Sequence, residues 1–246
     1  MTIDFSKVVS IFTSNFPLFL YGVGITLIFA IVGTIFGLLI GLVVGGIRAL
    51  DESEYDNILV IILKKIGKII TGLYIWIFRG TPMMVQAMFI YYVLKPTLDW
   101  TPLVAGLVII SINTGAYMAE IIRAGIQSVD KGQTEAAQSI GMNAFQTLIY
   151  IIFPQAIKNT FPSIGNQLIV NIKDSSMMNV IGVTELFFQT RSIAGSNYRY
   201  VETFIVAGAI YLFLTTISTY ILNYIEKNME ARTKSKNKDS YKDFCS

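Results

Sequence analysis

The chain has no histidine, a single cysteine, and few charges: only 14% of its 246 residues are Asp, Glu, Lys or Arg. Without histidine, the commonest general base and metal ligand is missing, and no carboxylate cluster replaces it, so we predict neither a catalytic residue nor a metal site. Cys245 has no second cysteine with which to form an internal disulfide. Soluble domains carry about a quarter charged residues, so this chain lacks the polar material to cover a water-facing surface.

Apolar residues make up 53% of the chain. Because each crossing of a bilayer takes roughly 20 apolar residues, the length allows about four to six membrane helices. We therefore predict an all-α polytopic membrane helix bundle that forms one domain over residues 1–246. Five stretches are expected to cross the membrane: about Leu18–Val44, Ile69–Leu94, Leu103–Ile122, Ile157–Phe188 and Val201–Ile225.

Two local patterns predict how these helices pack and bend. Four glycines of the first stretch recur every fourth residue and so share one helix face, which favours close packing in lipid: Gly33, Gly37, Gly41 and Gly45. The second stretch contains the run Arg79-Gly80-Thr81-Pro82. Proline removes a backbone donor, so the helix is expected to bend or break there.

Lysines and arginines are concentrated in three connecting regions, and this predicts the orientation. They lie between the first two stretches, between the third and fourth, and after the fifth: Arg48, Lys64, Lys65, Lys68; Arg123, Lys131, Lys158; and Lys227, Arg232, Lys234, Lys236, Lys238, Lys242. These regions share the cytoplasmic side only if the polar fourth stretch crosses. We therefore predict five spans, an outside N-terminus and a cytoplasmic C-terminus, with a disordered tail over about residues 231–246.

The connecting region at about residues 124–156 has the signals of two short helices. Asp130 and Gln133 have the spacing of a capping box, and Asn143 and Gln146 repeat it. Gly141 lies between them, where glycine readily adopts the left-handed conformation that ends a helix. Pro154 is expected to interrupt the second helix. Ala136 and Ala137 predict a low-relief surface that a groove on another protein could hold.

The same region resembles the coupling loop of permease subunits of ATP-binding-cassette importers. The resemblance rests on Glu135-Ala136-Ala137, Gly141, Ile151 and Phe153-Pro154, with Phe153 at a position where leucine is usual. Other segments resemble the branch that takes up polar amino acids: Phe78-Arg79-Gly80-Thr81-Pro82, Gly115-Ala116-Tyr117-Met118-Ala119-Glu120 with Arg123-Ala124-Gly125, and Ile172-Lys173-Asp174-Ser175-Ser176.

The resemblance implies a permease in a bacterial cell (inner) membrane that pairs with itself or with a sister subunit. It also implies two cytoplasmic ATPase subunits and an extracytoplasmic binding protein that delivers an amino acid, with no nucleic acid involved. ATP and Mg would be bound by the ATPase, so no cofactor is expected in this chain, which has no phosphate-binding loop of its own. Coupling to the ATPase would use Glu135, Ala136, Ala137, Gly141 and Pro154. A self-sufficient channel or secondary transporter is the alternative.

Polar residues inside the predicted spans are candidates for the substrate path, because such residues are costly in lipid. They are Gln86, Asn113, Thr114, Tyr117, Asn171, Lys173, Asp174 and Ser175. Lys173 and Asp174 together offer a donor and an acceptor for a zwitterionic amino acid, or else they neutralise each other structurally. Glu120 and Arg123 are expected to form a salt bridge, and Arg79 to anchor the break at Pro82.

Overall fold

The computed structural model describes residues 4–50 and 57–244, with side chains described as far as residue 229, and its regular structure there is helical. The predicted all-α membrane helix bundle is confirmed. The first half contains α1 (Phe5–Ser14), α2 (Phe16–Ala49), α3 (Ile58–Gly80), α4 (Met83–Leu98) and α5 (Pro102–Gln127). The second half contains α6 (Lys131–Ser139), α7 (Ala144–Thr147), α8 (Phe153–Asp174), α9 (Leu186–Asn197) and α10 (Tyr200–Phe244).

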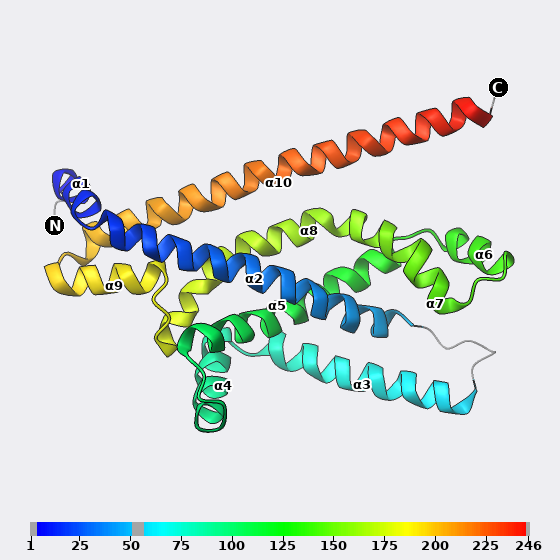
Figure 1. The fold of residues 1–246 in the computed structure, drawn as a ribbon, viewed down its shortest axis with the longest axis horizontal. Coiled ribbons are helices and arrows are strands. Elements are labelled where there is room, and N and C mark those ends of the chain that lie inside the picture. The colour runs from blue at the N-terminus through cyan, green and yellow to red at the C-terminus, as the bar shows by residue number, and fades with distance from the viewer. Residues whose placement is uncertain (1–3, 51–56, 245–246) are drawn as a thin grey trace.

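The bundle has two distinct ends (Figure 1). At one end lie α6 and α7, the last turns of α2 and α5, and the first turns of α3 and α8; we call this the coupling end. The N-terminus, α1 and α9 lie at the other end. The basic residues Arg48, Lys64, Arg123, Lys131 and Lys158 all belong to turns at the coupling end. The predicted clustering of positive charge at one end is therefore present, and the side of the membrane that this end faces stays a prediction.

Among the described residues, three helices are long and apolar enough to cross a membrane: α2, α5 and the Tyr200–Met229 part of α10. Crossing by α3 and α8, and with it the number of five spans, stays a prediction. The predicted break in the second stretch is confirmed, because α3 ends at Gly80 and α4 begins at Met83. Pro82 separates them, and α4 turns away across the end of α3 (Figure 1).

The predicted fourth span, Ile157–Phe188, is too long at its C-terminal end. The α8 helix ends at Asp174 and is followed by a 3₁₀ helix, Ser175–Ile181, and by Gly182 with φ of +92°. The buried carboxylate of Glu185 then starts α9 by accepting hydrogen bonds from the amides of Phe187 (2.7 Å) and Phe188 (2.8 Å). The predicted disordered tail falls within α10, where side chains beyond residue 229 are not described, so it stays a prediction.

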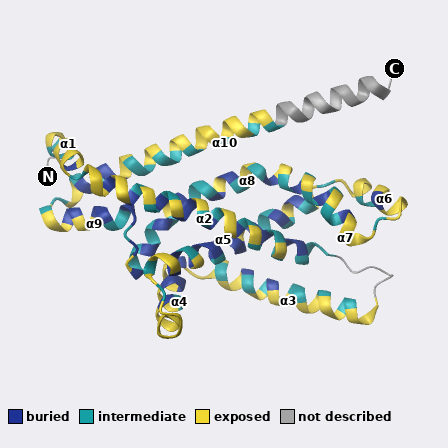
Figure 2. Ribbon diagram, in the orientation of Figure 1, coloured by how far each residue is buried: buried dark blue, intermediate teal, exposed yellow. Residues whose placement is uncertain are grey.

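The glycine face of α2 packs against α5, as predicted. A Cβ atom added at Gly37 would lie 2.5 Å from Thr114 Cγ2, and one at Gly45 would lie 2.8 Å from the carbonyl oxygen of Ala119. Glycine therefore permits the two backbones to approach more closely than any other residue would. Burial is concentrated where α2, α5 and α8 meet, whereas α10 and the outer face of α3 are largely exposed (Figure 2).

Candidate functional site

The α6 helix at the coupling end is fixed by hydrogen bonds at both of its ends. The Asp130 carboxylate accepts from the Gly132 amide at 2.7 Å. At the other end the Gly141 amide donates to Gln138 and the Met142 amide to Ala137, with Gly141 at φ of +85°. This pair of bonds is a Schellman motif, which requires the left-handed residue that was predicted. The returning half of the first predicted capping box is wrong, because the side-chain oxygen of Gln133 accepts from the Gln155 side chain instead.

The second predicted capping box is present. The side chain of Asn143 accepts from the Gln146 amide at 2.9 Å, and the Gln146 side chain accepts from the Asn143 amide at 3.0 Å. The α-helical pattern is interrupted beside Pro154, as expected, but the chain does not leave the helix there. The chain continues from α7 through a π-helical turn, Leu148–Ile152, into α8, whose first turn contains Pro154. Proline is tolerated there because the wider turn accommodates the missing backbone donor.

The two alanines of α6 lie in different environments. Ala136 and Glu135 are exposed, but Ala137 is 4% exposed and packs against its own chain, so the predicted contact surface does not include both alanines. Three large apolar side chains protrude from the same segment instead: Ile140, Phe145 and Tyr150 are 78%, 68% and 70% exposed. Exposed apolar side chains on a rigid segment that is otherwise polar are typical of a protein contact.

Asn113 and Gln86 repair the break between α3 and α4. Because Pro82 has no N–H, the carbonyl oxygen of Phe78 lacks its helical donor. Asn113 donates to this oxygen at 3.2 Å, and Gln86 donates to it at 3.0 Å. The Asn113 amide also donates to the Gln86 side chain at 2.9 Å. Gln86 and Asn113, both predicted for the substrate path, are buried in this conformation, and their hydrogen bonds stabilise the break between α3 and α4.

Thr114 and Asn171 form a clamp between three helices. The Thr114 hydroxyl donates to the Asn171 side chain at 3.0 Å, and Asn171 donates to the Thr34 hydroxyl at 2.9 Å. These residues lie on α5, α8 and α2 and are largely buried. Like Asn113 and Gln86, these side chains form hydrogen bonds with one another, as buried polar groups in a bilayer must.

The remaining candidates at the end of α8 are not brought together around a cavity. Lys173 is exposed and Asp174 is half-buried, and among the described residues no ion pair joins them. The Ser175 side chain is buried and donates to the Ile172 carbonyl oxygen at 2.9 Å. The structure therefore leaves the zwitterion-binding role of Lys173 and Asp174 without a pocket.

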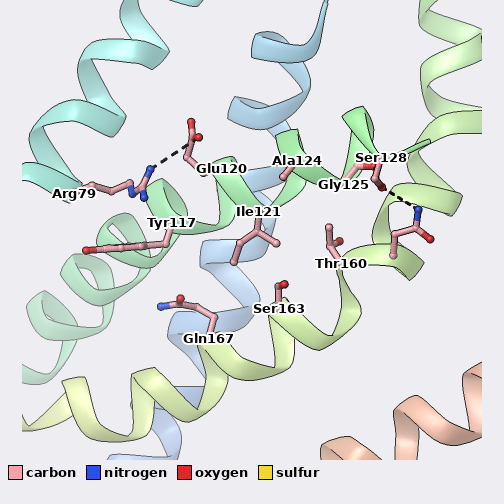
Figure 3. Close-up of a pocket in the computed structure, with 11 residues that line it drawn as sticks. Arg79, Tyr117, Glu120, Ile121, Ala124, Gly125, Ser128, Thr160, Ser163 and Gln167 are labelled. Carbon is pink, nitrogen blue, oxygen red and sulfur yellow. Dashed lines mark hydrogen bonds and ion pairs between the residues drawn. The ribbon is translucent and has the colours of Figure 1, made fainter. Parts of the chain in front are cut away.

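A cavity of about 460 Å³ lies between the end of α3, α5 and the first half of α8 (Figure 3). Of the predicted path residues, Tyr117 lines it. Its other polar lining comes from residues that were not predicted for the path: Arg79, Glu120, Ser128, Asn159, Thr160, Ser163 and Gln167. Thr160, Ser163 and Gln167 recur three and four residues apart, so helical spacing alone could have marked this face of α8.

Glu120 lies at the centre of an arginine cluster on the wall of this cavity. Its carboxylate is 2.8 Å from Arg123, which confirms the predicted salt bridge, and also 3.5 Å from Arg48 and 3.9 Å from Arg79. The Arg79 guanidinium also lies over the Tyr117 ring, 5.3 Å from its centroid. Three guanidinium groups meet one carboxylate, so the cluster carries excess positive charge.

A second cavity, of about 530 Å³, is also lined by Arg79. It shares Arg79 and Tyr117 with the first cavity and is also lined by Arg48, Trp76 and Ile75. Trp76 is 73% exposed. Arg79 and Tyr117 therefore line both cavities, and the second cavity is also bordered by a largely exposed aromatic side chain.

Known proteins are similar to this chain over most of its length. Residues 60–231 match the family described as binding-protein-dependent transport system inner membrane component. The glutamine transport system permease protein GlnP of Escherichia coli (strain K12) is 36% identical over 217 residues, which cover 87% of this chain and 94% of GlnP. The arginine transport system permease protein ArtQ of Bacillus subtilis (strain 168) is 34% identical, over 94% of this chain and 99% of ArtQ.

Solved structures show the same fold. The crystal structure of an amino acid ABC transporter with histidines matches with a TM-score of 0.77 and 38% identity, over 93% of this chain and 100% of that one. An inward-facing structure of the MetNI methionine ABC transporter matches with a TM-score of 0.71 at 19% identity, over 86% of this chain and 96% of that one, which supports the fold alone.

Proposed function

This chain belongs to the family of binding-protein-dependent transport system inner membrane components, and we propose that it forms the translocation pathway of an ATP-driven amino acid importer. The relatives that carry glutamine and arginine in their names support the substrate class. The observation that carries the proposal is the combination of a polar cavity between α3, α5 and α8 with a rigid, capped hairpin at the coupling end.

The cavity suits a zwitterion because it has groups of both charges on one wall. Arg79 can donate two parallel hydrogen bonds to a carboxylate, and Glu120 can accept from an ammonium group. Their 3.9 Å separation is the longest of the three ion pairs of Glu120. Arg48 and Arg123 stay with Glu120 when Arg79 turns to a ligand, so the carboxylate keeps partners throughout. This cavity replaces Lys173 and Asp174 as the proposed zwitterion site.

Coupling to ATP hydrolysis uses the hairpin. ATP and Mg are bound by a separate ATPase subunit, whose surface receives α6 through Glu135, Ala136 and the protruding Ile140 and Phe145. Gly141 fixes the angle between α6 and α7, and Pro154 lies where this segment joins α8, so movement of the hairpin is transmitted to the wall of the cavity. The full importer has two permease copies, identical or sister chains, two ATPase subunits and a binding protein outside.

The test is ATP hydrolysis by the reconstituted importer with its binding protein, measured against a panel of amino acids. Arg79→Gln and Glu120→Gln are expected to lower substrate-stimulated hydrolysis at least about tenfold while the ATPase still co-purifies, because each removes one charge-assisted contact. Lys173→Ala serves as the comparison and is expected to retain stimulation. Normal stimulation in both cavity variants would exclude this cavity, and uptake without any ATPase would favour a self-sufficient transporter.

A further inference from the structure

The α8 helix presents a second face to a separate crevice, on the side away from the cavity described above. This crevice, of about 160 Å³, lies between α8 and α10, which run antiparallel (Figure 1). Its wall contains Gly165, where an added Cβ would lie 3.1 Å from Leu222 Cδ2, so glycine allows α10 to approach. Phe161, Ile169 and Leu222 make the apolar part of the lining.

Four polar side chains line the same crevice: Asn166, Thr219, Asn223 and Glu226. Thr219 donates to the Thr215 carbonyl oxygen of its own helix at 2.7 Å. Asn166, Asn223 and Glu226 make no side-chain hydrogen bond or ion pair with any other residue that the structure describes. Beside them, Tyr220 and Tyr224 of α10 are 73% and 69% exposed. Asn166 and Asn223 are exposed and Glu226 is half-buried, so one carboxylate and two amides are open to a polar group from outside the chain.

The crevice lies near the C-terminal end of the apolar stretch of α10. Glu226 follows directly after the apolar stretch Val201–Ile225, and Lys227 is the next residue. Lys158, on the first turns of α8, lies toward the same coupling end. Exposed tyrosines together with lysines at the end of an apolar stretch are typical of the membrane interface.

We propose that this crevice binds the primary ammonium group of an aminophospholipid headgroup. Glu226 accepts from the ammonium group, the side-chain oxygens of Asn166 and Asn223 accept its remaining N–H bonds, and Lys227, next to Glu226 in the chain, pairs with the phosphate. The acyl chain lies along Ile169 and Leu222. The crevice, of about 160 Å³, is large enough for an ethanolamine group.

The experiment compares the assembled importer in nanodiscs of phosphatidylcholine alone, or with added phosphatidylethanolamine or phosphatidylglycerol, by native mass spectrometry of retained lipid. Phosphatidylethanolamine is expected to be retained preferentially, because the trimethylated ammonium of phosphatidylcholine has no N–H donors. Glu226→Gln and Asn223→Leu should each weaken this retention about tenfold, which corresponds to about 1.4 kcal/mol. Asn228→Leu is the matched control, since Asn228 is an exposed amide of α10 outside the crevice.

Several results would overturn the proposal. These are equal retention of the three lipids, unchanged retention in both crevice variants, or equal loss in the Asn228 control. Binding of free ethanolamine or a free amino acid that depends on Glu226 would assign the crevice to a soluble amine instead. A disulfide between two copies carrying Asn223→Cys and Cys245→Ser would show that a second copy fills it. If Glu226→Gln fails to assemble, the Asn223→Leu result decides.

Discussion

The side-chain amide of Asn113 donates a hydrogen bond to the carbonyl oxygen of Phe78, 35 residues earlier in the chain. Pro82 leaves this oxygen without its helical donor, so a residue of α5 completes the backbone of α3. The break between α3 and α4 and the position of Arg79 next to it are therefore set by α5, the helix that also carries Tyr117 and Glu120.

Asn113→Leu is expected to destabilise the protein by about 1–3 kcal/mol, because it removes a donor from Phe78 and a partner from Gln86 in a buried site. Thermal unfolding in detergent measures this change. Ser111→Ala is the control, since Ser111 bonds only within its own helix, to Leu107. An unchanged midpoint for Asn113→Leu would mean that the break does not depend on this bond.

Gly37→Ala and Gly24→Ala are expected to act in opposite directions although both lie on α2. The new methyl group at Gly37 collides with Thr114, which forces α2 and α5 apart at a cost of about 1–3 kcal/mol. At Gly24 nothing lies within 4 Å, so alanine should stabilise the helix by about 0.5–1 kcal/mol. Thermal unfolding of the two variants compares them directly, and equal effects would contradict the packing role of the glycine face.

Gly141→Val should abolish substrate-stimulated ATP hydrolysis by the importer, whereas Gly141→Asn should retain part of it. Space is not the obstacle, because nothing lies within 4 Å of an added Cβ. The positive φ is the obstacle, costing a β-branched residue about 1–2 kcal/mol or more, and asparagine tolerates this conformation better. Equal hydrolysis in the two variants, at equal membrane abundance, would mean that the angle between α6 and α7 does not matter for coupling.

Phe145→Ala should weaken association with the ATPase about tenfold, because a protruding aromatic side chain contributes roughly 1–2 kcal/mol or more to an interface. Glu135→Ala should be milder, since an exposed ion pair contributes about 0–1 kcal/mol. Titration of the purified ATPase onto the permease in nanodiscs measures both affinities. A larger loss for Glu135→Ala than for Phe145→Ala would show that charge, not apolar contact, dominates this interface.

Single cysteines at Asp4 and Gln138 should differ in their reaction with an impermeant thiol reagent, in a Cys245→Ser background. Asp4 lies at the end opposite to α6, so it should be labelled from outside intact cells, and Gln138 only after the membrane is opened. Ser53, a further position for this test, lies outside the described residues. Labelling of Gln138 in intact cells would reverse the orientation and remove the coupling role of α6.

Sequence alone predicted the coupling hairpin well because its signals are local. Asn143 and Gln146 form their capping box, and Gly141 has the expected positive φ, through contacts only a few residues apart. The predicted hydrogen bond from the Asp130 backbone amide to the Gln133 side chain does not form. The Gln133 side chain instead accepts a hydrogen bond from Gln155 of α8, a residue distant in sequence. Hydropathy placed the long helices but not their ends, since α8 stops at Asp174 within a stretch that stays apolar.

By itself, the sequence determined that this is a helical membrane protein with one basic end and a capped hairpin there, because composition, charge and caps are properties of neighbouring residues. Only the tertiary structure decided which polar residues share a cavity. Asn113 and Asn171, predicted for the path, face other helices and satisfy buried groups. Arg79 and Glu120 come from different helices and meet on a cavity wall because α3 and α5 pack side by side there, a relation that no spacing within either helix contains.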